Sequence, residues 1–420
     1  METVHIYYAI PHRCRSASLL RCLTLALLWL SSTSSLRADA PAFSAPVRLV
    51  SPTYAQLTLT NCNNVSNYYV MQFSTNLQDW VSYKTNHVIS LTDPMIDFAP
   101  ATNDTCFYRV IAVPFGPPYP FQWAMALGTN FNGNGKNPLV DSYDSSDTNY
   151  SSVATNAVQY YGTNVVQIYD ASRAKSGGDV AVYAAVTGNV ILGNGTINGH
   201  LHTGPGSLET QLQIGPHGTV GDITFAASNS GIQGDGTSSS WWAPDFNGGF
   251  YEVKAPTFTG TALPAPDSHG NTVLNGGTYT TTSSTIVSKL VVTGPTTLWV
   301  QGSASLGVTI AGTNASLILY VGKATGTGDS ISLSGNGTMN TPGYARNLQI
   351  YGLPSLTSID LHGNMAINAA IYAPNAAMVN GGGGTNTQNS VGSIVVKSMT
   401  LVGKWNFHYD ENLKTSLAPF

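Results

Sequence analysis

Short alternations of apolar and polar residues recur along the chain, and runs with the period of an amphipathic helix are not prominent. Residues 43–113 carry several such alternations between stretches rich in turn-forming residues: VRLV, AQLTLT, YYVMQFS, WVSYKT and CFYRVIAV. Runs of this length with period two are typical of strands that bury one face. This part of the chain therefore predicts a small β-sandwich.

Beyond residue 120 a longer pattern recurs, in which an apolar alternation meets Gly-Asn and ends in an apolar residue and Asn. Its copies are VILGNGTIN, ISLSGNGTMN, IDLHGNMAIN and the altered MTLVGKWNFH, with two looser copies offset by 18 residues at 290 and 308. Short strands joined at glycine corners such as Gly363 predict a β-solenoid with a period of about 20 residues. The equivalent Asn side chains are expected to form a column along its axis. An up-and-down barrel is the alternative, but it favours Asn-Gly or Asp-Gly hairpin turns instead.

Two segments divide the chain. Residues 114–120, PFGPPYP, predict a stiff linker and a domain boundary. At the N-terminus, three arginines precede the apolar stretch CLTLALLWL and the small-residue stretch RADAPA, which predicts a signal peptide within residues 1–40. The apolar stretch is too short to span a bilayer. We therefore expect an exported chain with domains at 43–113 and 121–420 and no later membrane span.

Charge is scarce throughout. Charged residues make up 9% of the chain, against about 25% in ordinary soluble proteins. Without residues 1–40 there remain 13 Lys and Arg and 19 Asp and Glu, a net charge of −6, with no basic run. Nucleic acid is therefore excluded as an expected partner. Equivalent positions in a solenoid lie about 4.8 Å apart, so like charges would repel, and the low charge fits the predicted fold.

The C-terminal part resembles an uncharacterised family of secreted bacterial proteins. The resemblance spans about residues 121–414 and is carried by NLQIYGLPSLTSIDLHGNMAINAAIYAPNA, GGGG and VGSIVVKSMTLVGKWNFHYDENL. It implies an all-β fold with a right-handed parallel β-helix and a location at the surface or in a pilus-like assembly, and it implies no catalytic residue. The segments YYVMQFSTNLQDW and FYRVIAV resemble fibronectin-type-III-like modules, which implies a spacer or adhesive unit.

Two groups of residues suggest covalent or metal chemistry. Cys62 and Cys106 are the cysteines that remain after signal removal, and in an oxidising compartment they predict a disulfide. His200 and His202 are two residues apart, so a strand would point both to one side, and His217 follows about one coil later. Such a trio could bind zinc, whereas a polar solvent-facing surface explains the same pattern without a metal.

An aromatic insertion, WWAPDFNGGF, interrupts the repeat. It contains Trp241, Trp242 and Asp245 and is flanked by Asp235 and Glu252. Adjacent tryptophans suit stacking on sugar rings, so these residues are a candidate carbohydrate site. Packing of the insertion against the flank of the solenoid is the alternative.

A second acidic segment, DSYDSSD, places Asp141, Asp144 and Asp147 three residues apart. Carboxylates at such intervals could bind calcium. The alternative is a turn in which Asp and Ser bond their own backbone.

The C-terminal segment WNFHYDEN aligns with the repeat. Phe407 falls at the position of the apolar residues such as Ile197, and His408 falls where the other copies have Asn. We expect His408 to be a variant of the Asn column that bonds an Asn in the neighbouring coil. Asp410 is expected to cap a short helix, so that residues from about 408 to 420 cover the last coil.

These patterns predict a secreted, non-enzymatic structural or adhesion-type β-helix protein of the cell surface or matrix, without a cofactor. Surface glycans or other envelope or appendage proteins are the expected partners. The alternative is a carbohydrate-binding or polysaccharide-degrading β-helix that uses residues 235–252. Polysaccharide cleavage needs converging carboxylates, and from Ser268 to Tyr409 the chain has only Asp329 and Asp360.

Overall fold

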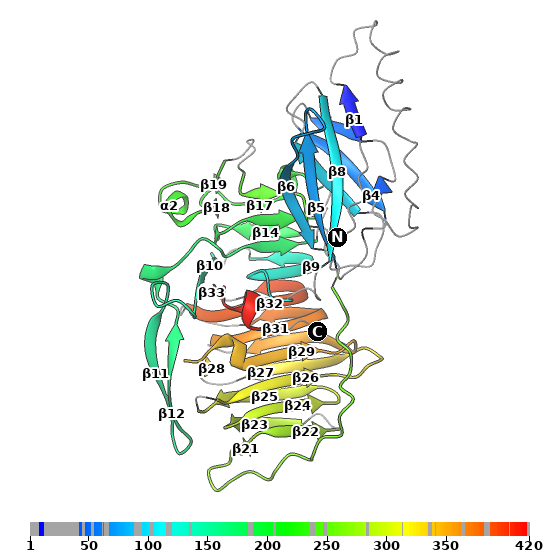
Figure 1. The fold of residues 1–420 in the computed structure, drawn as a ribbon. Coiled ribbons are helices and arrows are strands. Elements are labelled where there is room, and N and C mark those ends of the chain that lie inside the picture. Colours follow the sequence, from blue (N-terminus) through cyan, green and yellow to red (C-terminus); the bar gives the residue numbers. More distant parts are fainter. Residues whose placement is uncertain are drawn as a thin grey trace, which may run out of the picture. The chain divides into compact units, whose positions relative to one another are not determined.

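The protein is all-β and divides into two compact units, Met1–Pro118 with Asn247–Gly249, and Tyr119–Phe246 with Phe250–Phe420. The structure is a computed structural model (Figure 1). It describes residues 8–11, 42–43, 47–51, 54–60, 62, 67–87, 95–100, 105–114, 120–133, 137–183, 188–204, 207–234, 240–246, 250–282, 285–312, 314–334, 338–340, 342–362, 366–381, 387–402 and 404–417. Within these ranges, no helix has the length and apolar character needed to cross a membrane.

The first unit consists of two antiparallel sheets that share one apolar core. One sheet has the order β1-β8-β5-β6, and in the other β4 pairs with β2, β3 and β7. Alternate residues of β4, such as Leu57 and Leu59, meet Met71 of β5 and Val110 of β8 in that core. The assignment of this unit to a fibronectin-type-III-like module stays a prediction. Its strands are β1 (Tyr8–Pro11), β2 (Ala42–Phe43), β3 (Arg48–Ser51), β4 (Tyr54–Thr60), β5 (Asn67–Ser74), β6 (Val81–His87), β7 (Met95–Pro100) and β8 (Thr105–Pro114).

Most of the predicted signal peptide and linker lies outside the described residues. From residues 1–40, the structure describes only Tyr8–Pro11, which forms β1 and pairs antiparallel with β8. From residues 114–120, it describes Pro114 at the end of β8 and Pro120. Both assignments therefore remain predictions.

The predicted disulfide is not formed in the structure. Cys62 and Cys106 are both buried in the core of the first unit, and no disulfide joins them. Cysteine packs in an apolar core as a small hydrophobic residue, so burial accounts for both positions without a covalent bond.

The second unit is built on one sheet of 23 strands. All pairings between its named strands are parallel, apart from the separate antiparallel hairpin of β11 and β12. Its first part contains β9 (Met125–Asn132), β10 (Leu139–Tyr143), β11 (Ser152–Val158), β12 (Gly162–Ile168), η1 (Ala171–Arg173), β13 (Val180–Val182), β14 (Val190–Gly193), β15 (Thr196–Asn198), β16 (Leu201–Thr203), η2 (Glu209–Gln211), β17 (Gln213–Ile214), β18 (Thr219–Gly221), α2 (Ile223–Ala226), β19 (Gly231–Ile232) and β20 (Trp242–Ala243).

The second part of this unit continues the same sheet. It contains β21 (Thr272–Leu274), β22 (Gly277–Thr281), β23 (Thr285–Val292), β24 (Pro295–Val300), β25 (Ala304–Ile310), β26 (Ser316–Val321), β27 (Asp329–Ser334), β28 (Thr338–Met339), η3 (Ala345–Asn347), β29 (Leu348–Gly352), β30 (Leu356–His362), β31 (Ala366–Asn380), β32 (Gln388–Leu401), β33 (Trp405–Asp410) and α3 (Leu413–Ser416).

The order of the strands in space differs from their order in the sequence. β9 and β10 lie in the middle of the sheet, and β13 to β20 extend from them toward one end (Figure 1). The chain then runs to the opposite end, where β21 begins, and the later strands return toward the middle. There β32 pairs with β9 and β33 pairs with β10. We call these two pairings the seam, because they join segments more than 250 residues apart.

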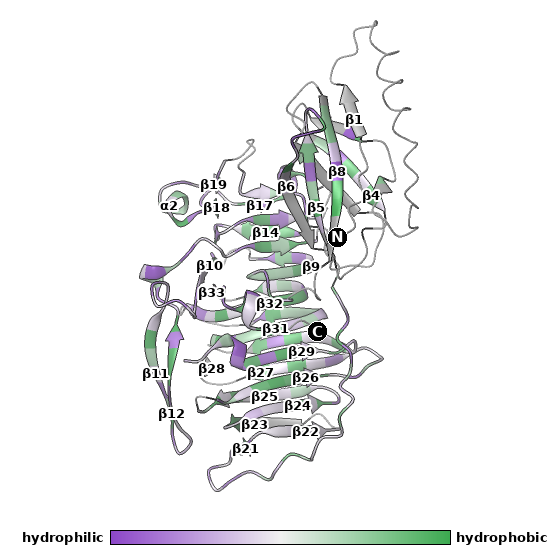
Figure 2. Cartoon of the chain, viewed as in Figure 1, coloured by the Kyte–Doolittle hydropathy of each residue, from purple (hydrophilic) through white to green (hydrophobic). Residues whose placement is uncertain are grey.

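Strand alternation fills a single core in this unit. In β25 and β26 the burial alternates residue by residue, and Leu306, Ile310, Leu317 and Leu319 belong to the core. Figure 2 shows green apolar positions recurring through the strands of this sheet from β14 to β26. Strands with this alternation contribute one inward row of apolar side chains and one outward row, whereas β31 is buried on both faces from Ile367 to Pro374.

The predicted column positions agree with the strand register. Ile367 pairs with Met339, and Phe407 pairs with Val140, which in turn pairs with Ile197. The Asn column bonds through the backbone rather than through amide pairs: Asn340 Nδ2 donates to the Asn368 carbonyl oxygen at 2.9 Å. Asn368 Nδ2 donates to the Gly343 carbonyl oxygen at 3.0 Å. The predicted corner glycine Gly363 lies outside the described residues.

The predicted C-terminal cap is wrong in its position. β33 is paired on both sides, with β32 and with β10, so residues 408–410 lie inside the sheet. A short helix, α3, does follow, and Leu413 and Leu417 are buried as expected. Its N-cap residue is Asn412 rather than Asp410. The sequence order alone suggested a terminal coil, because it does not reveal that β10 pairs with β33.

Gly392 in β32 offers a test of the close approach between strands. Its φ is +140°, and a Cβ there would lie 1.8 Å from the Ala369 carbonyl oxygen of β31. We predict that Gly392→Ala lowers the free energy of unfolding by roughly 3 kcal/mol or prevents folding, because backbone atoms must move. The midpoint of urea denaturation measures this. Gly328→Ala is the control, since Gly328 has φ +95° but open space around it; equal losses in both variants would contradict a steric cause.

Candidate ligand-binding site

Two groups that the sequence analysis kept apart, the histidines and the aromatic insertion, come together on β16 and β20. Leu201 pairs with Trp242, so His200 and Trp241 occupy adjacent positions just before these strands. The His200 imidazole stacks on the Trp241 indole, with ring centroids 4.2 Å apart and planes inclined by 6°. Because His200 keeps 45% of its side-chain surface exposed, this stack is available to a ligand from solvent.

Asp179 completes the same column on the other side of His200. Its Oδ1 accepts the His200 backbone N–H at 2.8 Å and lies 3.3 Å from His200 Nδ1. Burial works to raise the pKa of Asp179, but the hydrogen bonds from His200 and the nearby His202 outweigh burial and hold that pKa below its ordinary value. Asp179 is therefore an anion that fixes the orientation of the His200 ring.

His202 forms a second oriented pair beside the first. Its Nδ1 lies 2.7 Å from Asp245 Oδ1, and the side chains keep about a fifth of their surface exposed, at 20% and 18%. The ring stands edge-on to Trp123 at 4.9 Å and lies 5.9 Å from the His200 ring. Two imidazoles, two carboxylates and two indoles thus form one partly exposed surface, which we call the histidine–tryptophan site (Trp123, Asp179, His200, His202, Trp241 and Asp245).

Trp242 has a supporting position. It follows the inward row of its strand and packs against the core, and its Nε1 donates to Thr203 Oγ1 at 3.1 Å. The adjacent tryptophans therefore point to different sides, as alternation along a strand requires. Both tryptophans pack against the core and both are partly buried, so packing of the insertion accounts for each of them; Trp241 in addition stacks on the exposed His200 ring.

The structure does not assemble the predicted zinc trio. His217 is exposed in the turn before β18, where its backbone N–H donates to Asn194 Oδ1. Among the described residues, no group of three His, Cys, Asp or Glu side chains is placed to hold a metal ion. Glu252 is also elsewhere, since its Oε1 lies 3.5 Å from Asn375 Nδ2, and Asp235 lies outside the described residues.

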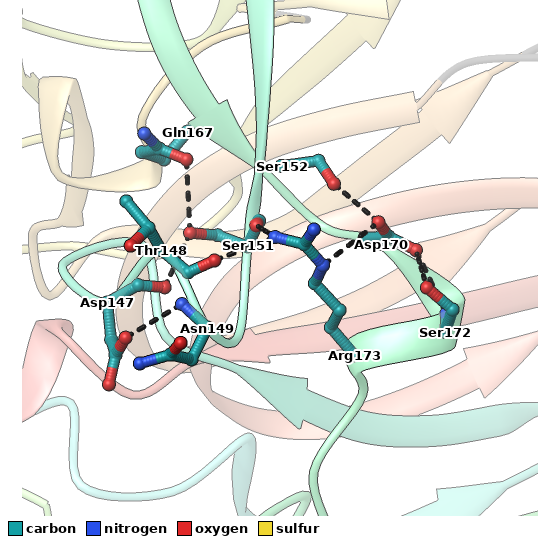
Figure 3. A network of polar contacts seen from close by, with 9 residues as sticks. All are labelled: Asp147, Thr148, Asn149, Ser151, Ser152, Gln167, Asp170, Ser172 and Arg173. Carbon is teal, nitrogen blue, oxygen red and sulfur yellow. Dashed lines mark hydrogen bonds and ion pairs between the residues drawn. The ribbon is translucent and has the colours of Figure 1, made fainter.

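The acidic segment DSYDSSD forms local turns. Asp144 Oδ1 accepts the N–H of Ser146 at 2.8 Å, and Asp147 Oδ1 accepts the N–H of Asn149 at 2.8 Å. Figure 3 shows the Asp147 turn beside the base of the β11–β12 hairpin, where Arg173 bonds the carbonyl oxygens of Thr148 and Ser151. Asp144 and Asp147 therefore form the local turns that were the alternative to a calcium site.

The third aspartate, Asp141, meets His408 at the seam. Asp141 Oδ1 lies 2.6 Å from His408 Nδ1, and both side chains are almost fully buried. The Tyr169 hydroxyl donates to Asp141 Oδ2 at 2.7 Å, and the Tyr169 ring stacks on His408 at 3.5 Å. On the other side, His408 Nε2 lies 3.2 Å from Asn389 Oδ1 in β32, a bond to a neighbouring Asn as expected. Because its side chain is buried and bonded on both sides, His408 has a structural role.

Asp410 is buried next to this network. Its Oδ1 accepts the N–H groups of Ser145 and Asn412, at 3.0 and 3.2 Å. Burial raises the pKa of Asp410 to about 6, against the lowering effect of these hydrogen bonds. The group therefore links the stability of the seam to pH.

Comparison with known proteins gives one match. Residues 252–416 are similar to a domain of unknown function (DUF7305). The match covers the strands from β21 to β33 and fits the predicted resemblance to an uncharacterised family, but it does not include the histidine–tryptophan site. No curated protein and no solved structure matches the chain.

Sequence reasoning missed Asp179, Trp123 and Tyr169. Asp179 occupies the position of His200 in the preceding coil, because Val180 pairs with Leu201. Alignment of these two coils could therefore have identified it. The other two are on connecting segments, where no repeat defines the position of a side chain.

We predict that His408→Ala lowers the free energy of unfolding by roughly 3 to 5 kcal/mol, because Asp141 is left as a buried charge without its imidazole. Thermal and urea denaturation measure the loss. Asn406→Ala, two residues earlier on the same strand, is the control. A loss no larger than that of the control would show that the pair does not stabilise the seam.

A pH titration tests Asp410. Its folded pKa of about 6 exceeds the ordinary value of 3.8, so the folded state binds a proton more tightly than the unfolded state. The Asp410 carboxyl therefore does not lower the free energy of unfolding at low pH, where it is protonated in both states. As pH rises from about 4 to above 6, its ionisation lowers that free energy by up to about 3 kcal/mol. We predict that Asp410→Asn gains that much stability relative to wild type between about pH 4 and pH 7 in urea denaturation. A pH-independent difference would contradict the assignment.

Proposed function

We propose that the protein is an exported, non-enzymatic, adhesion-type protein whose second unit is a right-handed parallel β-helix that binds a neutral glycan. The observation that carries this proposal is the convergence of His200, Trp241, His202 and Asp245 on a partly exposed surface. The predicted signal segment, the scarcity of charge and the resemblance to secreted bacterial surface proteins support export and a role outside the cytoplasm.

The pairing scheme supports the β-helix. Leu274 pairs with Val292 and Val292 pairs with Ile310, so each step advances 18 residues and returns to the same face. Larger steps, such as that from Val321 to Gly352, carry longer connections. Parallel strands joined by such crossovers are right-handed in nearly all proteins, which supports the proposed hand.

The chemistry of the histidine–tryptophan site supports a carbohydrate ligand. Indole rings offer apolar surface to the C–H face of a pyranose, and carboxylates and imidazoles bond its hydroxyls. Each histidine lies beside a carboxylate, so the four side chains carry no excess positive charge that would attract an anion. A neutral sugar is therefore a better match than a polyanion.

Binding without cleavage is favoured over glycoside hydrolysis. Hydrolysis needs a pair of carboxyl groups facing one glycosidic bond. The two acids predicted for such a role have different partners, since Asp245 lies beside His202 and Glu252 lies beside Asn375. Asp179, the second carboxylate of the site, is bonded to the backbone and ring of His200.

We predict that the secreted protein is retarded in affinity gel electrophoresis by at least one neutral polysaccharide among hydroxyethyl cellulose, dextran and galactomannan, and less by alginate. Trp241→Ala should weaken this binding about fivefold or more, since aromatic contacts contribute about 1 kcal/mol. His217→Ala, a histidine outside the site, is the matched control and should bind as wild type.

Two outcomes would contradict this proposal. If none of these polysaccharides binds, or if Trp241→Ala binds as wild type, the site does not recognise glycans. If reducing ends accumulate on incubation and Asp245→Asn abolishes their release, the protein is an enzyme.

A further inference from the structure

A column of four aromatic side chains runs along one face of the second unit. Trp299 pairs with Tyr320, Tyr320 with Tyr351, and Tyr351 with Tyr372, on β24, β26, β29 and β31. On β24 and β26 the residues on either side of the ring, such as Leu319 and Val321, belong to the core, so the rings lie on the outward row. The sequence repeats this feature as LWV, LYV, IYG and IYA.

The same column continues across the seam to the histidine–tryptophan site. From Tyr372 the register passes through Val395, Ala126 and Ala181 to His202. Tyr320 and His202 are thus six pairings apart, a separation of about 29 Å at the usual strand spacing. Two aromatic surfaces that are distant in sequence therefore lie on one line along the stack.

Exposure along this line is uneven. Trp299, Tyr320 and His202 are partly exposed. All five positions of the column between Tyr320 and His202 are buried, and these are Tyr351, Tyr372, Val395, Ala126 and Ala181. Phe121 packs on both buried rings, and the Tyr372 hydroxyl donates to the Tyr251 carbonyl oxygen. The segments that cover the middle of the column also present partly exposed aromatic rings, which are Trp123, Phe250 and Tyr251.

The rings are held in place and the column lacks permanent charge. Trp299 Nε1 donates to the Gly322 carbonyl oxygen at 3.0 Å, and the Tyr320 and Tyr351 rings stack at 5.4 Å. From Thr280 to Ala243, His202 is the one position of this column whose side chain can carry a charge near neutral pH. Fixed, uncharged aromatic surfaces suit the faces of neutral sugars, whereas a polyanion would find no cation at these positions.

We propose that one neutral, linear polysaccharide binds along the line of this column. The histidine–tryptophan site holds it at one end, Trp299 and Tyr320 hold it at the other, and between them it passes over the segments that cover the buried positions. This inference rests on the proposed glycan binding. It adds a second contact surface, at Trp299 and Tyr320, and restricts the ligand to neutral, linear polysaccharides. Two contacts on one chain raise the affinity through effective concentration, so a chain longer than about 29 Å should bind more tightly than a short one.

The test compares ligand lengths. Isothermal titration of the intact protein is carried out with hydroxyethyl cellulose, dextran and galactomannan and with the trisaccharide prepared from each. We expect the long chain to bind at least about tenfold more tightly, per site, than its trisaccharide. Trp299→Ala and Tyr320→Ala should remove this length advantage and leave the trisaccharide affinity unchanged, whereas Trp241→Ala should weaken both.

Matched variants separate recognition from structure. Tyr320→Phe keeps the ring and should retain the length advantage, and Ile318→Ala, on the neighbouring outward row of β26, should not alter it. Melting curves identify variants that fail to fold; if Trp299→Ala fails, Tyr320→Ala alone decides. If Trp299→Ala and Tyr320→Ala bind long chains as wild type while Trp241→Ala does not, binding along the column is refuted and glycan binding stands. Exclusive binding of alginate refutes the neutral class, and no binding of any polysaccharide refutes both proposals.

Discussion

The parallel pairing at the seam is the constraint on which the second unit depends. A stack of parallel strands leaves unpaired backbone groups wherever it stops, and such edges are costly and prone to aggregation. Here β9 and β10 would form an open edge without the C-terminal strands, and β32 and β33 would form another. By pairing β32 with β9 and β33 with β10, the chain turns two open edges into one continuous sheet.

The seam also explains why the buried Asp and His side chains described in the second unit, Asp141, His408 and Asp410, gather on β10 and β33. His408 and Asp141 face each other because β33 and β10 are adjacent, and Tyr169 covers the pair from the segment after the hairpin. Removing such a pair from water is favourable only when its members satisfy one another. The network therefore favours this register, since a shifted β33 would leave Asp141 buried without an imidazole.

The sequence predicted local repetition well and spatial order poorly. The alignment of Phe407 with Ile197 and of His408 with the Asn positions agrees with the observed register, because inward and outward rows impose a pattern on every strand. The predicted terminal cap was wrong, because nothing in the local pattern of β10 shows that it pairs with a strand 267 residues later. Of the candidate site, His200, His202, Trp241 and Asp245 were identified as two unrelated groups, since a side chain delivered by a loop, as Asp245 is, has no periodicity.

The outward rows are where such a fold can acquire binding chemistry. Inward positions must be apolar and of matched size at every level, and Leu317, Leu319 and Val321 leave no room for variation. Outward positions that reach solvent are free of that demand, so the partly exposed His202 can follow the buried Ala181 in one column. Asp179 and Asp245, which orient their histidines, break the regularity of these rows and provide specific hydrogen bonding at His200 and His202.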